Sequence, residues 1–133
     1  MIVADTNLIA YLWIPGTHAS LAETVVRRDP EWSAPLLWRS ELRSVLALCL
    51  RKRLMDPPRA LELAARAEEQ LAREYPVPSS QVLRCVAESK CSAHDCELVA
   101  LSRELGTPLG TTDRRLVKTL PGEAVHATAF AGT

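Results

Sequence analysis

The first seven residues constrain the fold more than any other part of this 133-residue chain. An apolar run, Ile2 to Ala4, stops at the carboxylate of Asp5, and a second apolar segment, Leu8 to Trp13, follows two polar residues. This order predicts a short buried strand that ends at Asp5 and turns directly into a helix. Asp5 is a site candidate because open α/β sheets bind ligands just beyond the carboxyl ends of their strands. A helix N-cap is the competing interpretation of the same side chain.

Helical patterns alternate with short apolar runs along the rest of the chain. We expect helices at 8–12, 20–28, 35–53, 56–73, 79–89, 92–105 and 114–120, and strands at 2–5, 31–34, 74–78, 108–112 and 124–127. Such alternation predicts an α/β domain whose parallel sheet is covered by helices on both faces. The two long helices, 35–53 and 56–73, should form an antiparallel hairpin. The whole chain, 1–133, is expected to be one domain.

Some expectations concern single residues. Pro35 suits the first turn of a helix, where its missing N–H is not needed. The two prolines in 74–78 restrict that strand to an edge of the sheet or to a strand end. Ser79 or Ser80 is expected to cap the helix that follows. The inward side of the helix at 56–73 is expected to carry Leu61, Ala64, Ala65 and Leu71.

Composition limits how the chain can bind nucleic acid. Lys plus Arg is 16 and Asp plus Glu is 16, so the formal net charge is zero and any such binding must depend on a local basic patch. No targeting segment and no apolar stretch of membrane-spanning length is recognised, which favours the cytoplasm. The four cysteines do not have the spacing of a zinc site.

Three further acids are comparable to Asp5. Glu41 lies on the edge of the apolar stripe of its helix, whereas Asp95 shares a helix face with Leu98 and Val99. Asp113 repeats the pattern of Asp5, since it follows a strand and begins a helix. Each acid also has an ordinary structural interpretation: Glu41 as a side chain reaching water, and the two aspartates as parts of helix caps.

Two strand-end aspartates in one parallel sheet should open onto the same edge. If Glu41 and Asp95 also point there from their helices, four carboxylates converge, and bare carboxylates at such short range repel one another. A divalent cation relieves this repulsion, and Mg²⁺ prefers carboxylate oxygen, water and phosphate as ligands. The chemistry that fits is metal-assisted hydrolysis of a phosphodiester.

Four segments together resemble the acidic motifs of the PIN-domain family, most of all VapC-type ribonuclease toxins of bacterial toxin–antitoxin systems. They are Asp5-Thr6-Asn7, Ser40-Glu41-Leu42, the run from Ser92 to Leu101, and Thr111-Thr112-Asp113-Arg114-Arg115-Leu116. The similarity runs in the right order over nearly the whole chain. Each motif is weak by itself, and the set of four at these spacings is specific.

The resemblance implies a three-layer α/β/α sandwich with a five-stranded parallel sheet, and an endoribonuclease that uses Mg²⁺, with Mn²⁺ as an alternative. It assigns Asp5, Glu41, Asp95 and Asp113 as the catalytic, metal-binding acids, and Asn7 and Thr112 as supporting polar residues. It also implies products with a 5′-phosphate and a 3′-hydroxyl, a homodimer, and a cognate antitoxin protein that blocks the site. No acid follows Asp113 in the next few residues, so one and two metal ions both stay open.

Basic and aromatic residues offer further hypotheses. Arg114, Arg115 and Lys118 flank Asp113 and are candidates for RNA binding, with a solvated helix face as the alternative. His94 is rotated by about 100° from Asp95 around the helix, which favours a surface position. The three tryptophans, Trp13, Trp32 and Trp38, are expected to pack in the core or an interface rather than stack on bases.

Two other functional classes fit parts of the pattern. In the first, the fold is kept as a binding module whose acidic pocket engages a basic segment of a partner protein, with weak or no catalysis. The second is a phosphatase with Asp5 as nucleophile. That chemistry usually needs a second aspartate two residues later, where this chain has Asn7.

Overall fold

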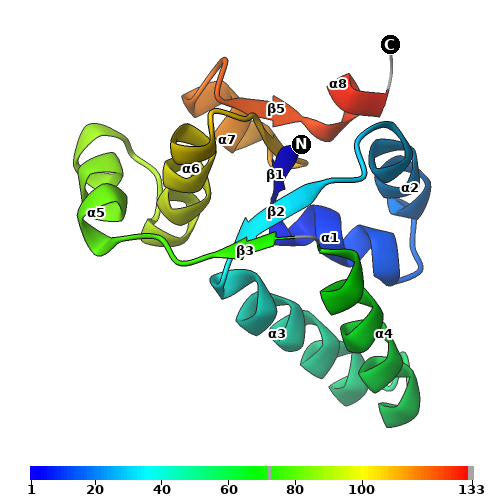
Figure 1. Cartoon of the computed structure of the whole chain (residues 1–133). Coiled ribbons are helices and arrows are strands. Elements are labelled where there is room, and N and C mark those ends of the chain that lie inside the picture. Colours follow the sequence, from blue (N-terminus) through cyan, green and yellow to red (C-terminus); the bar gives the residue numbers. More distant parts are fainter. Residues whose placement is uncertain (72, 132–133) are drawn as a thin grey trace.

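The computed structural model describes residues 1–71 and 73–131, which form one five-stranded sheet surrounded by helices (Figure 1). The strands are β1 (Ile2–Ala4), β2 (Trp32–Pro35), β3 (Arg73–Tyr75), β4 (Leu109–Thr111) and β5 (Ala124–His126). The helices are α1 (Thr6–Trp13), α2 (Ala19–Arg28), α3 (Leu37–Arg51), α4 (Pro57–Gln70), α5 (Ser79–Glu88), α6 (Ala93–Leu105), α7 (Arg114–Thr119) and α8 (Ala127–Ala131).

All four strand pairs are parallel, and the strand order is β3-β2-β1-β4-β5. The predicted α/β class with a five-stranded parallel sheet is confirmed. The first strand lies in the middle of the sheet, where Val3 pairs with Ser33 of β2 on one side and with Leu109 of β4 on the other. The proline-flanked strand β3 is at an edge, as its sequence predicted.

Alternation along β1 divides the core into two layers. Ile2 and Ala4 belong to a hydrophobic cluster formed with α1, α2, α3, α4 and α8. Val3, which points to the opposite face, belongs to a second cluster formed with α5, α6 and α7. Because successive side chains of a strand point to opposite faces, these three residues place helices on both sides of the sheet. Trp32 and Trp38 are fully buried in the first cluster, as expected of core tryptophans.

Helices α3 and α4 form the expected hairpin, which extends away from the sheet at the bottom of Figure 1. Arg39 of α3 ties this hairpin to the edge strand, since its guanidinium is 2.7 Å from Glu74 of β3 and also pairs with Glu68 of α4. The expected inner face of α4 was wrong at Leu61, which is 73% exposed, and at Ala65, which is also exposed. The buried residues of α4 and its C-cap are Ala60, Leu63, Ala67 and Leu71.

Two helix starts differ from the sequence prediction. Pro35 is not in the first turn of α3; it is the last residue of β2, where it pairs with Tyr75. Proline is tolerated there because the lost N–H falls at the end of the ladder. The expected serine cap of α5 was also wrong, since Pro78 occupies the N-cap without a side-chain hydrogen bond. The short helix α8, directly after β5, had no sequence signal that we recognised.

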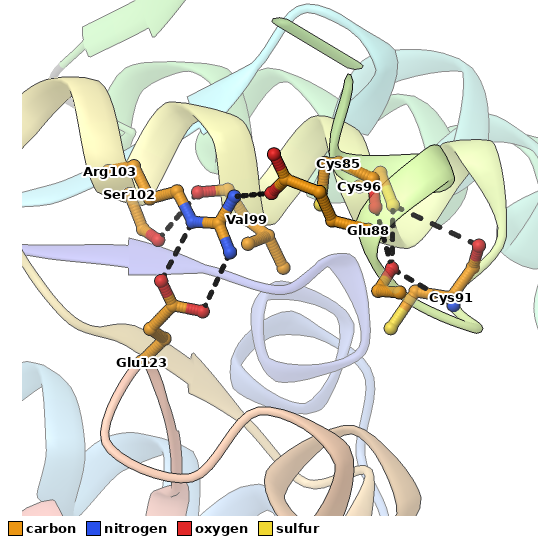
Figure 2. Close-up of polar contacts among 9 residues, drawn as sticks. Cys85, Glu88, Cys91, Cys96, Val99, Ser102, Arg103 and Glu123 are labelled. Carbon is orange, nitrogen blue, oxygen red and sulfur yellow. Dashed lines mark hydrogen bonds and ion pairs between the residues drawn. The ribbon is translucent and has the colours of Figure 1, made fainter. Parts of the chain in front are cut away.

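Helix α6 is fixed to its surroundings at both ends (Figure 2). Near its C-terminus, Arg103 lies 2.7 Å from Glu123 in the loop before β5 and 3.6 Å from Glu88 of α5. At the other end, the Cys96 sulfur is 3.7 Å from the Ser89 hydroxyl in the loop after α5. Gly106 ends the helix in the left-handed conformation (φ 61°), as expected of a glycine there.

The four cysteines are free thiols. Burial, followed by the neighbouring Cys96, raises the pKa of the Cys85 thiol to about 11. Cys49, Cys85 and Cys96 are buried, and Cys91 is half-buried. Within residues 1–71 and 73–131, no helix has the length and apolar character needed to cross a membrane.

Candidate functional site

Asp5 lies at the carboxyl end of the central strand and is the helix N-cap that its sequence position allowed. As the N-cap of α1, it accepts the backbone N–H of Asn7 over 3.4 Å. Its other carboxylate oxygen, Oδ2, accepts the hydroxyl of Thr111 at 2.7 Å. The cap bond is long and the hydroxyl bond is short, so Thr111 is the stronger constraint on the carboxylate.

The environment of Asp5 opposes its ionisation. Burial raises the pKa of the carboxyl above its usual value of 3.8, and the charges of Glu41 and Asp95 raise it further. The hydrogen bonds from Thr111 and Asn7 act in the opposite direction. The carboxylates of Glu41 on α3 and Asp95 on α6 are therefore close enough to act electrostatically on Asp5 at the end of β1.

Glu41 has its own hydroxyl donor. It is half-buried on α3, and Thr6, the first residue of α1, donates its hydroxyl to Glu41 Oε1 at 2.7 Å. Thr6 is only 4% exposed and Glu41 is half-buried, so this hydrogen bond is partly shielded from water. The bond fixes one carboxylate oxygen and leaves Oε2 available for a ligand.

Asp95 is in the first turn of α6 and is half-buried. Its backbone N–H donates to the Ser92 hydroxyl at 3.1 Å, so Ser92 is the N-cap that the sequence predicted. Leu98 and Val99, on the same helix face, are buried as expected. No described side chain donates a hydrogen bond to the Asp95 carboxylate, which leaves both of its oxygens available.

Asp113 is positioned differently from the other three acids. Its Oδ1 caps α7 by accepting the N–H groups of Arg115 at 2.9 Å and Leu116 at 3.3 Å. Its own backbone N–H donates to the Thr111 hydroxyl oxygen at 3.0 Å. Asp113 is not among the charges that perturb Asp5. The structure therefore brings Asp5, Glu41 and Asp95 into electrostatic contact and holds Asp113 beside them through Thr111.

The fit of a divalent cation to these acids is mixed. The donor chemistry suits a hard cation, because every candidate ligand is a carboxylate, and burial followed by its acidic neighbours raises the pKa of Asp5. The spacing is less suitable: among residues 1–71 and 73–131, no three His, Cys, Asp or Glu side chains are grouped tightly enough to hold a metal ion. Side-chain rotation at Glu41 and Asp95 is thus part of any metal-binding hypothesis.

The supporting residues named from the sequence have less direct positions. The Asn7 side chain is exposed, and its described contact with Asp5 is through the backbone. Thr112 is half-buried and makes none of the hydrogen bonds described for the acids. Thr6 and Thr111, which do make them, were missed. The register of β1 against β4 could have identified Thr111. Ala4 pairs with Gly110, which puts the next residues, Asp5 and Thr111, side by side.

The surface beside the acids carries positive charge. Arg114, Arg115 and Lys118 are all exposed on α7. Arg115 also lies 4.0 Å from Asp113, the outer limit of an ion pair. His94 is exposed, in line with the surface position expected from its place on the helix.

Comparison with protein-family models and with curated protein sequences gives no match. Among solved structures, the chain is similar to the crystal structure of PAE2754 from Pyrobaculum aerophilum, with a TM-score of 0.77 and 18% sequence identity. The similarity covers 98% of this chain and 85% of the other. At this identity the likeness supports the α/β fold and says nothing of function.

Proposed function

We propose that this chain is a PIN-domain, VapC-type endoribonuclease that uses Mg²⁺ or Mn²⁺ to hydrolyse RNA phosphodiester bonds. The observation that carries the proposal is the position of Asp5 at the carboxyl end of the central strand, buried within electrostatic range of Glu41 and Asp95. Burial, with two further acids nearby, raises the pKa of Asp5, and carboxyl groups perturbed in this way cluster at binding and catalytic sites.

The protein groups have defined parts in this proposal. Asp5, Glu41 and Asp95 would hold the cation, with Asp113 beside them at the end of β4. A bound cation supplies Lewis-acid polarisation of a phosphate oxygen and an acidified water. Thr111 and Thr6 orient the carboxylates of Asp5 and Glu41 before any ligand arrives. Asp95, which has no hydrogen-bond donor among the described residues, has the freedom to accept a proton from the attacking water.

The direct test uses RNA cleavage by the purified chain. We expect cleavage of single-stranded RNA with Mg²⁺ or Mn²⁺, loss of cleavage in EDTA, and a loss of more than about 100-fold in Asp5→Asn. Asp56→Asn is the matched control, because Asp56 is also a helix N-cap but lies on the exposed start of α4. Cleavage that survives both EDTA and Asp5→Asn would remove the basis of the assignment.

The biological setting belongs to the same proposal. A toxin of this class would act in the cytoplasm as a homodimer and would be inhibited by a cognate antitoxin. Size-exclusion chromatography with light scattering tests the dimer. Co-expression with the product of a neighbouring small gene tests the antitoxin, which should bind tightly and suppress RNA cleavage.

A catalytically weak binding module is the second candidate. It is favoured by one observation, the absence of a tight group of three metal-binding side chains in the described part of the chain. Here the acids would engage a basic segment of a partner protein. Calorimetry separates the two: Mg²⁺ or Mn²⁺ binding that Asp5→Asn weakens supports the nuclease, whereas tight partner binding without metal binding or cleavage supports the module.

A further inference from the structure

A second cavity adjoins the acidic site. It has a volume of about 430 Å³, within the range of small-ligand sites. Its walls come from the loop between α5 and α6, the first turn of α6, and α7. Lys90, Cys91, Ser92, Asp95 and Arg115 are among the residues that line it. We refer to it as the 90–115 cavity.

Asp95 is shared between the 90–115 cavity and the acidic site. Its carboxylate acts on Asp5 electrostatically, and the same residue lines the cavity. The cavity and the acidic site therefore meet at Asp95. This continuity makes the cavity a candidate site for the part of the ligand next to the reacting group.

The cavity carries the opposite charge from the acidic site. Arg115 is 83% exposed at its side chain, and its described ion pair, with Asp113, is at 4.0 Å. Lys90 is exposed and has no ion pair among the described residues. The Ser92 oxygen accepts the Asp95 N–H, so its own hydroxyl hydrogen is free to donate. Two cations and a hydroxyl donor make up a phosphate-binding set.

We infer that the 90–115 cavity binds the phosphate group of the nucleotide next to the cleaved bond, through Lys90 and Arg115. The inference rests on the proposed ribonuclease function, because it assigns the neighbouring subsite of the same substrate. One phosphate lies at the acids with the cation and the adjacent one lies in the cavity. The chain has zero net charge, so this local pair of cations supplies attraction that overall charge does not.

Cys91 provides a binding readout that does not depend on cleavage. It lines the cavity and is half-buried, whereas Cys49, Cys85 and Cys96 are buried. A maleimide adds the Cys91 sulfur and its proton across the probe's double bond, with no leaving group. We expect single-stranded RNA, added with Mg²⁺ for less time than its cleavage takes, to slow this addition at least about fivefold, as occupancy of most sites requires.

Variants identify the groups responsible. Protection of Cys91 should be lost in Lys90→Ala and in Arg115→Ala. Each change should also reduce the slope of log binding constant against log salt concentration by about the amount expected for one phosphate contact. Arg84→Ala is the matched control, because Arg84 is an exposed cation on α5 that lines a different cavity. It should keep full protection. Circular dichroism shows whether each variant is folded.

The possible outcomes separate this inference from the proposed function. RNA cleavage without protection of Cys91, or protection that survives both Lys90→Ala and Arg115→Ala, overturns the inference and leaves the nuclease proposal standing. Protection without any cleavage supports phosphate binding in the cavity and contradicts the nuclease proposal. Protection by polyglutamate but not by RNA assigns the cavity to an acidic protein segment and also overturns the inference.

Discussion

Replacing Thr111 with valine is the sharpest test of how the site is built. Valine has nearly the same shape, so the substitution removes the hydroxyl and leaves almost no cavity. Thr111 is fully buried. Its hydroxyl donates to Asp5 Oδ2 at 2.7 Å, and its oxygen accepts the Asp113 N–H at 3.0 Å. Thr111→Val therefore removes two hydrogen bonds at once from the ends of β1 and β4.

The expected loss of stability follows from these two bonds. The hydrogen bond to the Asp5 carboxylate is charge-assisted and contributes about 2 kcal/mol. The Asp113 N–H then lacks its partner in a half-buried position, which costs about 1 kcal/mol more. A total of about 3 kcal/mol corresponds to a fall in Tm of roughly 12 °C for a domain of this size.

The same substitution should alter the pH dependence of catalysis. The Thr111 hydrogen bond lowers the pKa of Asp5 against the effect of burial. Without it, the pKa rises further, because less of the carboxylate charge is stabilised. The acid limb of the pH–rate profile should therefore move to higher pH in Thr111→Val. Urea denaturation at pH 7 and RNA cleavage rates across the pH range measure the two effects.

Thr112→Val is the matched control, because this neighbouring threonine is half-buried and makes no described hydrogen bond to an acid. It should stay within about 0.5 kcal/mol of the wild type. Thr111→Ser keeps the hydroxyl and should retain the wild-type pH profile despite the loss of one methyl group. A Thr111→Val protein as stable as the wild type, or a larger loss in Thr112→Val, would refute the bonding scheme.

Three further changes have calculable directions. Without metal, the Asp5→Asn protein should be more stable than the wild type at pH 7, by about 1.4 kcal/mol for each unit by which folding raises the pKa of Asp5. This gain in stability should vanish as the pH falls below 3.8, where the Asp5 carboxyl is protonated in the unfolded chain as well. Arg39 lowers the pKa of Glu74, so Glu74→Gln should be less stable than the wild type at neutral pH, and the difference should disappear as the pH falls through the lowered pKa. Leu63→Ala should cost about 2–5 kcal/mol by urea denaturation because Leu63 is buried, whereas exposed Leu61→Ala should cost less than about 0.5 kcal/mol.

The sheet was predictable from the sequence because its signal is local. The apolar run before Asp5 is buried at every position, and each parallel strand needs a helical crossover before the next, which the alternation of patterns supplied. The inner face of α4 was not predictable in the same way. Its many alanines offer two stripes of similar quality, and only packing against α1 and α3 selected the one that contains Leu63 and Ala67.

The polar contacts of the site depend on register rather than on local pattern. Thr111 and Asp5 are 106 residues apart, and Thr6 and Glu41 are 35 apart. The sequence indicated which elements the acids end or begin, and therefore which edge of the sheet they share. It did not indicate which of two adjacent threonines faces Asp5, because a shift of one residue sends a strand side chain to the opposite face.

The two threonine contacts explain how the fold tolerates several acids in one place. Burial and repulsion by Glu41 and Asp95 oppose the ionised form of Asp5, and the Thr111 hydroxyl returns part of that cost because an O–H group stabilises a carboxylate more than a neutral acid. The Thr111 oxygen also accepts an N–H, which polarises its hydroxyl and strengthens the bond to Asp5. These bonds fix the two carboxylates without neutralising them. In the proposed nuclease, a bound cation would relieve the repulsion that Glu41 and Asp95 exert on Asp5.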